Sequence, residues 1–185
     1  MNLDGAGLMI VGRDAADMLI GLLLVRLTTM QPLAGSWVGT YEYLEPEVPG
    51  SHLVSFTLKL FDGSSWRLDG EVWENPDVGV DGRGIISGWS WRRHVWFRKV
   101  MPSPQVVHDP KPIPLEDYVQ AHFGERIESD PGAPVVSYRG VIAQNAECVN
   151  GTWSIPHRRL VLASNRVIVI PFARGTWQMR RDEAT

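Results

Sequence analysis

The sequence predicts an all-β fold, an antiparallel up-and-down β-barrel of about eight strands. From residue 35 onward, apolar and polar residues alternate with a period of two in eight or nine short segments, which is typical of strands with one buried face. Short turns rich in Gly, Pro, Asn and Asp join these segments. Gly and Trp occur together in four of them, at 35–37, 88–91, 151–153 and 175–177.

Each predicted strand has one apolar face, which we expect to point into the barrel. The first strand, 35–45, has an aromatic inner face made of Trp37, Tyr41 and Tyr43. The second and third strands follow loops that contain Pro-Gly and Asp-Gly, and their inner residues include Phe56, Leu58, Trp66 and Leu68. Later strands add Ile86 (84–91), Phe97 (94–100), Tyr138 (136–142) and Trp177 (175–181). The segment 147–155 and the apolar run 167–172 complete the set.

The first 29 residues differ from the barrel domain, which we place at 30–185. Met18, Leu22 and Val25 have helical spacing, with Asp14 before them and Arg26 after them, so a short amphipathic helix is expected. A poorly ordered extension and a membrane-surface anchor are the alternatives. The apolar run 18–25 is far shorter than the roughly 20 residues that span a bilayer, and we expect no secretory signal.

A long insertion, 101–134, separates strands five and six. It has prolines towards both ends and a helical segment from about Leu115 to Ile127. Its length is typical of a lid or strap rather than of a simple connection. Because Trp89, Trp91 and Trp96 cannot all face the lumen, we expect the insertion to cover those that point outward.

Composition excludes some classes of partner and setting. The net charge of -3 and the pI near 5.9 give no overall field for nucleic acid or anionic lipid, so neither is expected. Outward Trp residues beside Arg92 and Arg93 could stack bases, but the overall acidity argues against it. The single cysteine, Cys148, cannot form an intramolecular disulfide. This favours the reducing cytoplasm, with the thiol buried in a strand.

Few residues indicate chemistry. The five histidines are dispersed without metal-ligand spacing, so no metal and no cofactor are expected. Asp69 and Glu71 share the outer face of the third strand, where surface ion pairs are favoured over a catalytic dyad. Lys99 shares the register of Phe97. Either its amine reaches water at the strand end, or it points inward and must be paired or have a lowered pKa.

The chain resembles the calycin superfamily, which includes lipocalins, fatty-acid-binding proteins and avidins. The resemblance rests on Gly35 and Trp37 in the first strand and on Arg180 or Arg181 late in the last one. It implies that Trp37 closes one barrel end with the basic side chain across its indole. The first strand is also similar to that of small haem-binding barrels related to nitrobindin. His157 would have to be the proximal ligand, but its neighbours resemble a turn, so haem is not expected.

These observations predict that the barrel binds a small apolar or aromatic ligand without catalysis, since about eight strands enclose room for one small ligand. The expected ligand-binding residues are Trp37, Tyr41, Tyr43, Phe56, Leu58, Trp66, Leu68, Ile86, Phe97, Lys99, Tyr138 and Trp177. A small-molecule enzyme of the cyclase, isomerase or hydrolase type is the first alternative, and an interaction module with a filled barrel is the second. A homo-oligomer formed through residues 1–29 or the outward Trp residues is possible.

Overall fold

The computed structural model describes residues 33–45, 53–63, 66–106, 112–129 and 132–183. The predicted N-terminal helix, within residues 1–29, lies outside the described residues and stays a prediction. Within them, no helix has both the length and the apolar character that crossing a membrane requires.

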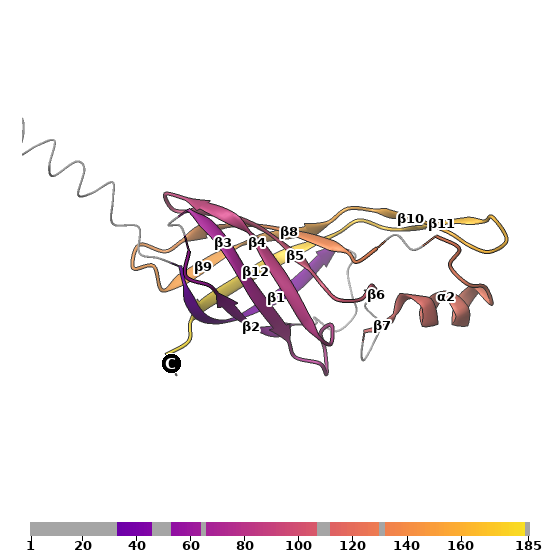
Figure 1. Cartoon of the computed structure of the whole chain (residues 1–185), viewed down its shortest axis with the longest axis horizontal. Helices are drawn as coiled ribbons and strands as arrows, with labels where there is room; N and C mark the ends of the chain where they lie inside the picture. The colour runs from indigo at the N-terminus through magenta and orange to yellow at the C-terminus, as the bar shows by residue number, and fades with distance from the viewer. Residues whose placement is uncertain (1–32, 46–52, 64–65, 107–111, 130–131, 184–185) are drawn as a thin grey trace, which may run out of the picture. The chain divides into compact units, whose positions relative to one another are not determined.

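Eight antiparallel strands form a closed barrel (Figure 1), which confirms the predicted fold class. The strands are β1 (Gly35–Glu45), β2 (Val54–Leu60), β3 (Arg67–Glu74), β4 (Arg83–Trp91), β5 (His94–Val100), β8 (Val135–Ile142), β9 (Cys148–Ile155) and β12 (Ala173–Arg181). Each strand pairs with the next one of this series, and β12 pairs with β1 to close the ring. Closure leaves no free edge in this sheet.

Trp37 and Arg181 lie at one end of the barrel. The indole is fully buried, and its Nε1 donates to the Leu33 carbonyl oxygen at 2.8 Å. The Arg181 guanidinium lies 4.8 Å from the centre of the indole and donates to the Ala34 carbonyl oxygen at 3.1 Å. The predicted stacking of a basic side chain on this Trp is therefore present, with Arg181 as the residue involved.

Within the described residues, five short elements lie outside the barrel sheet. They are β6 (Gln105–Val106), β7 (Ile113–Pro114), α2 (Leu115–Phe123), β10 (Arg158–Val161) and β11 (Val167–Ile170). The hairpin β10–β11 and helix α2 share a second small core, made of Leu115, Val119, Leu160 and Leu162. Figure 1 shows the helix and the hairpin beside one end of the barrel.

Several details of the expected elements are wrong. Helix α2 ends at Phe123 rather than near Ile127, because Gly124 adopts a left-handed conformation with φ of 66° that stops it. The apolar run 167–172 contributes no barrel strand: β11 pairs with β10 instead. Residues after His157 form β10 rather than a turn.

The expected positions of two side chains and the expected cover over the outward Trp residues are also wrong. Trp66 comes before β3 at the barrel rim and is 59% exposed, because the inner face ends there. The described part of the insertion packs on the second core and leaves Trp89 and Trp91 exposed. Cys148 is exposed rather than buried.

Candidate functional site

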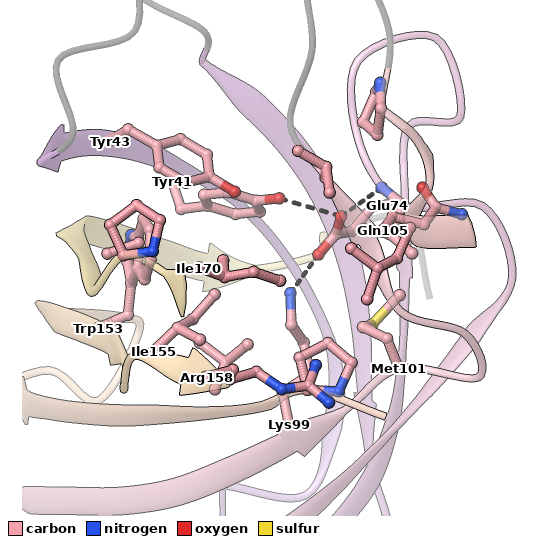
Figure 2. A pocket seen from close by; sticks show the side chains of 18 of the residues that line it. Tyr41, Tyr43, Glu74, Lys99, Met101, Gln105, Trp153, Ile155, Arg158 and Ile170 are labelled. Carbon is pink, nitrogen blue, oxygen red and sulfur yellow. Dashed lines mark hydrogen bonds and ion pairs between the residues drawn. The ribbon is translucent and has the colours of Figure 1, made fainter. Parts of the chain in front are cut away.

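A cavity of about 210 Å³ lies at the barrel end opposite Trp37. It is formed by the ends of six barrel strands together with residues of the insertion and of the β10–β11 hairpin (Figure 2). The barrel contributes Tyr41, Tyr43, Glu74, Lys99, Val136, Tyr138, Trp153, Ile155 and Ala173. The elements outside the sheet contribute residues that include Met101, Gln105, Val106, Leu115, Arg158 and Ile170. The wall is mainly apolar.

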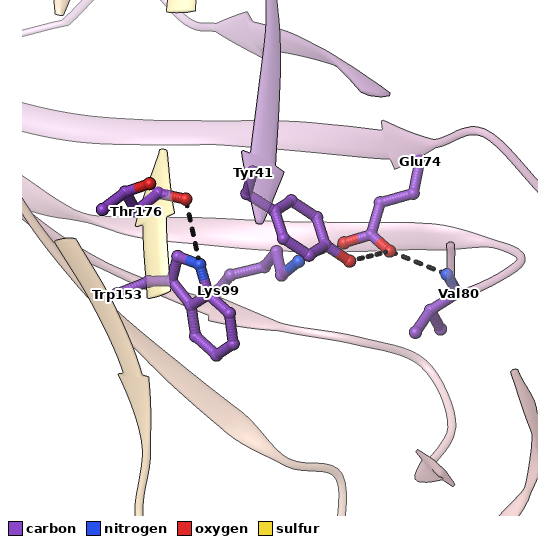
Figure 3. Close-up of polar contacts among 6 residues, drawn as sticks. All are labelled: Tyr41, Glu74, Val80, Lys99, Trp153 and Thr176. Carbon is purple, nitrogen blue, oxygen red and sulfur yellow. Dashed lines mark hydrogen bonds and ion pairs between the residues drawn. The ribbon is translucent and has the colours of Figure 1, made fainter. Parts of the chain in front are cut away.

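Glu74 and Lys99 form an ion pair in the cavity wall, and both residues are buried. The second carboxylate oxygen of Glu74 accepts hydrogen bonds from the Tyr41 hydroxyl at 3.0 Å and from the Val80 backbone N–H at 2.7 Å. Figures 2 and 3 show the Tyr41, Glu74 and Lys99 side chains pointing toward one another. The carboxylate therefore has three donors and a compensating charge, as a buried ion needs.

The pKa of Lys99 is raised above its ordinary value. Burial alone would lower it, but attraction from the Tyr138 oxygen and the Glu74 carboxylate, with hydrogen bonds to both, outweighs burial. The ammonium also lies 5.0 Å from the centre of the Tyr41 ring, which favours the charged form. Lys99 therefore stays protonated at neutral pH, where it can donate a hydrogen bond but cannot act as a base.

The three cavity tyrosines, Tyr41, Tyr43 and Tyr138, also stay protonated. Burial and then the negative charge of Glu74 raise the pKa of Tyr41 well above its ordinary value. Burial raises the pKa of Tyr43 and of Tyr138 by more than the charge of Lys99 lowers it. These hydroxyls are neutral hydrogen-bonding groups rather than nucleophiles.

Trp153 forms the cavity wall opposite the Glu74–Lys99 pair, and its ring has a fixed orientation. Its Nε1 donates to the carbonyl oxygen of Thr176 at 3.2 Å (Figure 3) and to that of Glu42 at 3.1 Å. Its ring meets the Tyr43 ring edge to face at 4.7 Å. Gly175 makes room for it, because a Cβ there would lie 2.6 Å from Nε1. The cavity thus has a rigid aromatic wall facing a buried polar cluster.

The structure brings only part of the predicted binding set to this cavity. Tyr41, Tyr43, Lys99 and Tyr138 line it. Trp37, Leu58, Leu68, Ile86, Phe97 and Trp177 are buried in the main core, with half-buried Phe56 packed against them. Trp66 is exposed. Of the two sequence-based alternatives for Lys99, the structure shows the inward, paired one: the residue is only 5% exposed.

Sequence reasoning missed Glu74 and Trp153. Glu74 continues the alternation of Leu68, Gly70 and Val72 onto the inner face of β3, which is a signal that was available. Trp153 likewise shares the parity of buried Val149 in β9. No comparable signal exists for Gln105 or Arg158, because elements outside the barrel bring them to the cavity.

The carboxylates expected on the surface are paired there. Asp69 lies 2.6 Å from Arg67, and Glu71 lies 2.9 Å from Arg83. Among the described residues, no group of three or more His, Cys, Asp and Glu side chains is placed to hold a metal ion. The cavity is thus the strongest candidate site in the described part of the chain.

Comparisons with known proteins give no further guidance. No protein-family model, curated protein or solved structure matches this chain. The function therefore has to be argued from the cavity itself.

Proposed function

We propose that the protein binds one small apolar or aromatic molecule in the cavity between Trp153 and the Glu74–Lys99 pair, without transforming it. The observation that carries this proposal is the volume of about 210 Å³ within a mainly apolar wall. An apolar cavity of roughly 150 Å³ is enough to bind benzene. A ligand of one or two rings fits the available space better than a drug-sized molecule, which needs about 300 Å³ or more.

The polar cluster suggests how such a ligand is oriented. Glu74 is already saturated by three donors, whereas the hydroxyl oxygens of the tyrosines and the ammonium of Lys99 border the cavity. A single hydroxyl or carbonyl group on the ligand can hydrogen-bond there while its ring lies against Trp153. We therefore favour a neutral aromatic ligand with one polar group.

We also propose that the chain is a calycin-like barrel of the cytoplasm. The closed eight-stranded ring and the guanidinium of Arg181 over Trp37 support the comparison with calycins. The single cysteine supports a reducing compartment.

A small-molecule enzyme is the second candidate, because a buried polar pair borders the cavity. The protonation of Lys99 and the three donors on Glu74 leave neither group as a ready base, so binding is favoured. Incubation of the protein with a bound aromatic compound separates the two candidates: a binder releases the compound with its mass unchanged, and an enzyme releases a different one.

The proposal is tested by titrating the full chain with 2-naphthol and following the fluorescence of the probe. We expect saturable binding at one site, and Ala173→Phe, which fills the cavity, should weaken it at least tenfold. Thr57→Phe adds the same ring on an exposed position of β2 and should leave binding unchanged. Thermal unfolding of each variant checks the fold. Unsaturable binding, or equal binding by folded Ala173→Phe, contradicts the proposal.

A further inference from the structure

A second feature, independent of the cavity, is an uncovered apolar face on the outside of β3, β4, β5 and β8. We call it the aromatic face, and it consists of Trp73, Ile85, Trp89, Trp91, Trp96, Val100, Val135 and Val141. Trp73, Trp89 and Trp91 are between 39% and 61% exposed. The rings of Trp89 and Trp96 stack at 4.5 Å. A face of this kind on a soluble domain is typical of an interaction site.

The strand register arranges this face in parallel rows. One row runs across the sheet as Glu71, Ile85, Val100 and Val135. Another runs as Arg67, Trp89, Trp96 and Arg139. Between them lies a polar row of Asp69, Ser87, Arg98 and Ser137. An acid thus begins the aliphatic row, and a base begins the aromatic row on the same strand.

We propose that the aromatic face joins two copies of this chain in a symmetric dimer. A two-fold axis that lies along the polar row exchanges the other two rows and keeps each strand opposite its own copy. Trp89 of one protomer then covers Ile85 of its partner, and Trp96 covers Val100. Arg67, which pairs with Asp69 in its own protomer, then faces the partner's Glu71, which pairs with Arg83. The two ion pairs meet as alternating charges, while Arg139 lies opposite the partner's Val135.

The size of the face fits a stable dimer. A fully covered indole buries roughly 200 Å². Because Trp73, Trp89 and Trp91 are 39%, 50% and 61% exposed, docking hides about 300 Å² of the three indoles together. The half-exposed aliphatic side chains and the polar rim bring the face to the order of 800 Å², which each partner contributes to a standard interface.

The charges favour a second copy over a polyanion. The face carries Asp69 and Glu71 as well as its arginines, and acidic groups oppose a phosphate backbone. The axis does bring Arg98 toward its own copy, and this like-charge pair weakens the dimer. The axis brings Asp69 toward its own copy as well, but Arg67 of the same protomer neutralises its charge.

The test is the mass in solution of the full chain, by light scattering on a sizing column and by sedimentation. We expect a dimer for the unmodified protein and a monomer for Trp89→Glu. Arg67→Glu and Glu71→Arg should each weaken self-association at least tenfold, since each places like charges opposite one another. An equimolar mixture of these two variants should restore the dimer, because the carboxylate introduced at position 67 of one then faces the guanidinium introduced at position 71 of the other. This recovery cannot come from misfolded protein.

Two further variants complete the experiment. Arg98→Ser should tighten the dimer, and Arg159→Glu, at the exposed residue of β10, should leave it unchanged. A monomer at the highest soluble concentration overturns the proposal, as does a mixture that stays monomeric. If the protein is a monomer that binds single-stranded DNA, and Trp89→Glu abolishes this binding, the face is assigned to nucleic acid instead.

Discussion

The ion pair between Lys99 and Glu74 gives the sharpest prediction about stability. Lys99→Met removes one partner of a pair in which both residues are almost fully buried. Breaking such a pair typically costs about 3–5 kcal/mol, because the remaining charge is uncompensated. Glu74 keeps two donors, the Tyr41 hydroxyl and the Val80 N–H, so we expect a loss at the lower end, about 3 kcal/mol.

The double variant Glu74→Gln with Lys99→Met isolates the pair. The Gln side-chain oxygen still accepts from Tyr41 and Val80, and no buried charge remains, so the double variant should be more stable than Lys99→Met alone. The free energy of unfolding is measured by urea titration with Trp fluorescence at one fixed protein concentration. Lys59→Met, on an exposed residue of β2, is the matched control and should change it by less than about 0.5 kcal/mol. A loss below about 1 kcal/mol for Lys99→Met, or additive losses in the double variant, would refute the reasoning.

Three further predictions concern the barrel. Folding raises the pKa of Lys99 and of the cavity tyrosines, so at high pH the folded state holds protons that the unfolded state loses. The free energy of unfolding should therefore be constant near neutral pH and fall above about pH 10. The expected fall is up to about 1.4 kcal/mol per group and pH unit. The phenolate absorbance of these three tyrosines should appear only with unfolding, and their earlier ionisation would contradict this. Arg181→Met should cost about 1–2 kcal/mol through lost contact with Trp37 and Ala34, measured by urea unfolding against Arg180→Met, and equal effects would contradict the stacking. Gly175→Ala should destabilise the barrel and shift the fluorescence of bound 2-naphthol, because a Cβ there overlaps the Glu42 carbonyl oxygen and crowds Trp153; unchanged stability and fluorescence would contradict that packing.

The barrel itself could be predicted because period-two alternation is a local signal that each strand carries. Trp37 and Tyr41 show this: their parity alone places them inside, and both are buried. The position of Arg181 over Trp37 followed from the calycin resemblance rather than from periodicity. Trp66 shows the limit of the same reasoning, because alternation does not reveal at which residue a strand and its buried face begin.

The site could be predicted only in part because it depends on contacts between distant segments. The sequence left two alternatives open for Lys99, and only the position of Glu74 on a separate strand decides between them. The apolar run that contains Val167–Ile170 resembles a barrel strand, yet it pairs with β10 and helps to enclose the cavity. Such pairing has no signature within the run itself.

The central claim is that the barrel end near Trp153 holds an accessible cavity for a small aromatic ligand. A crystal of the full chain soaked with iodobenzene tests it most directly, through the anomalous signal of iodine. We predict an iodine position bounded by Tyr41, Trp153 and Ile155, with the Glu74–Lys99 pair intact beside it. A cavity filled by the protein's own side chains, with no iodine inside the barrel, would contradict the account.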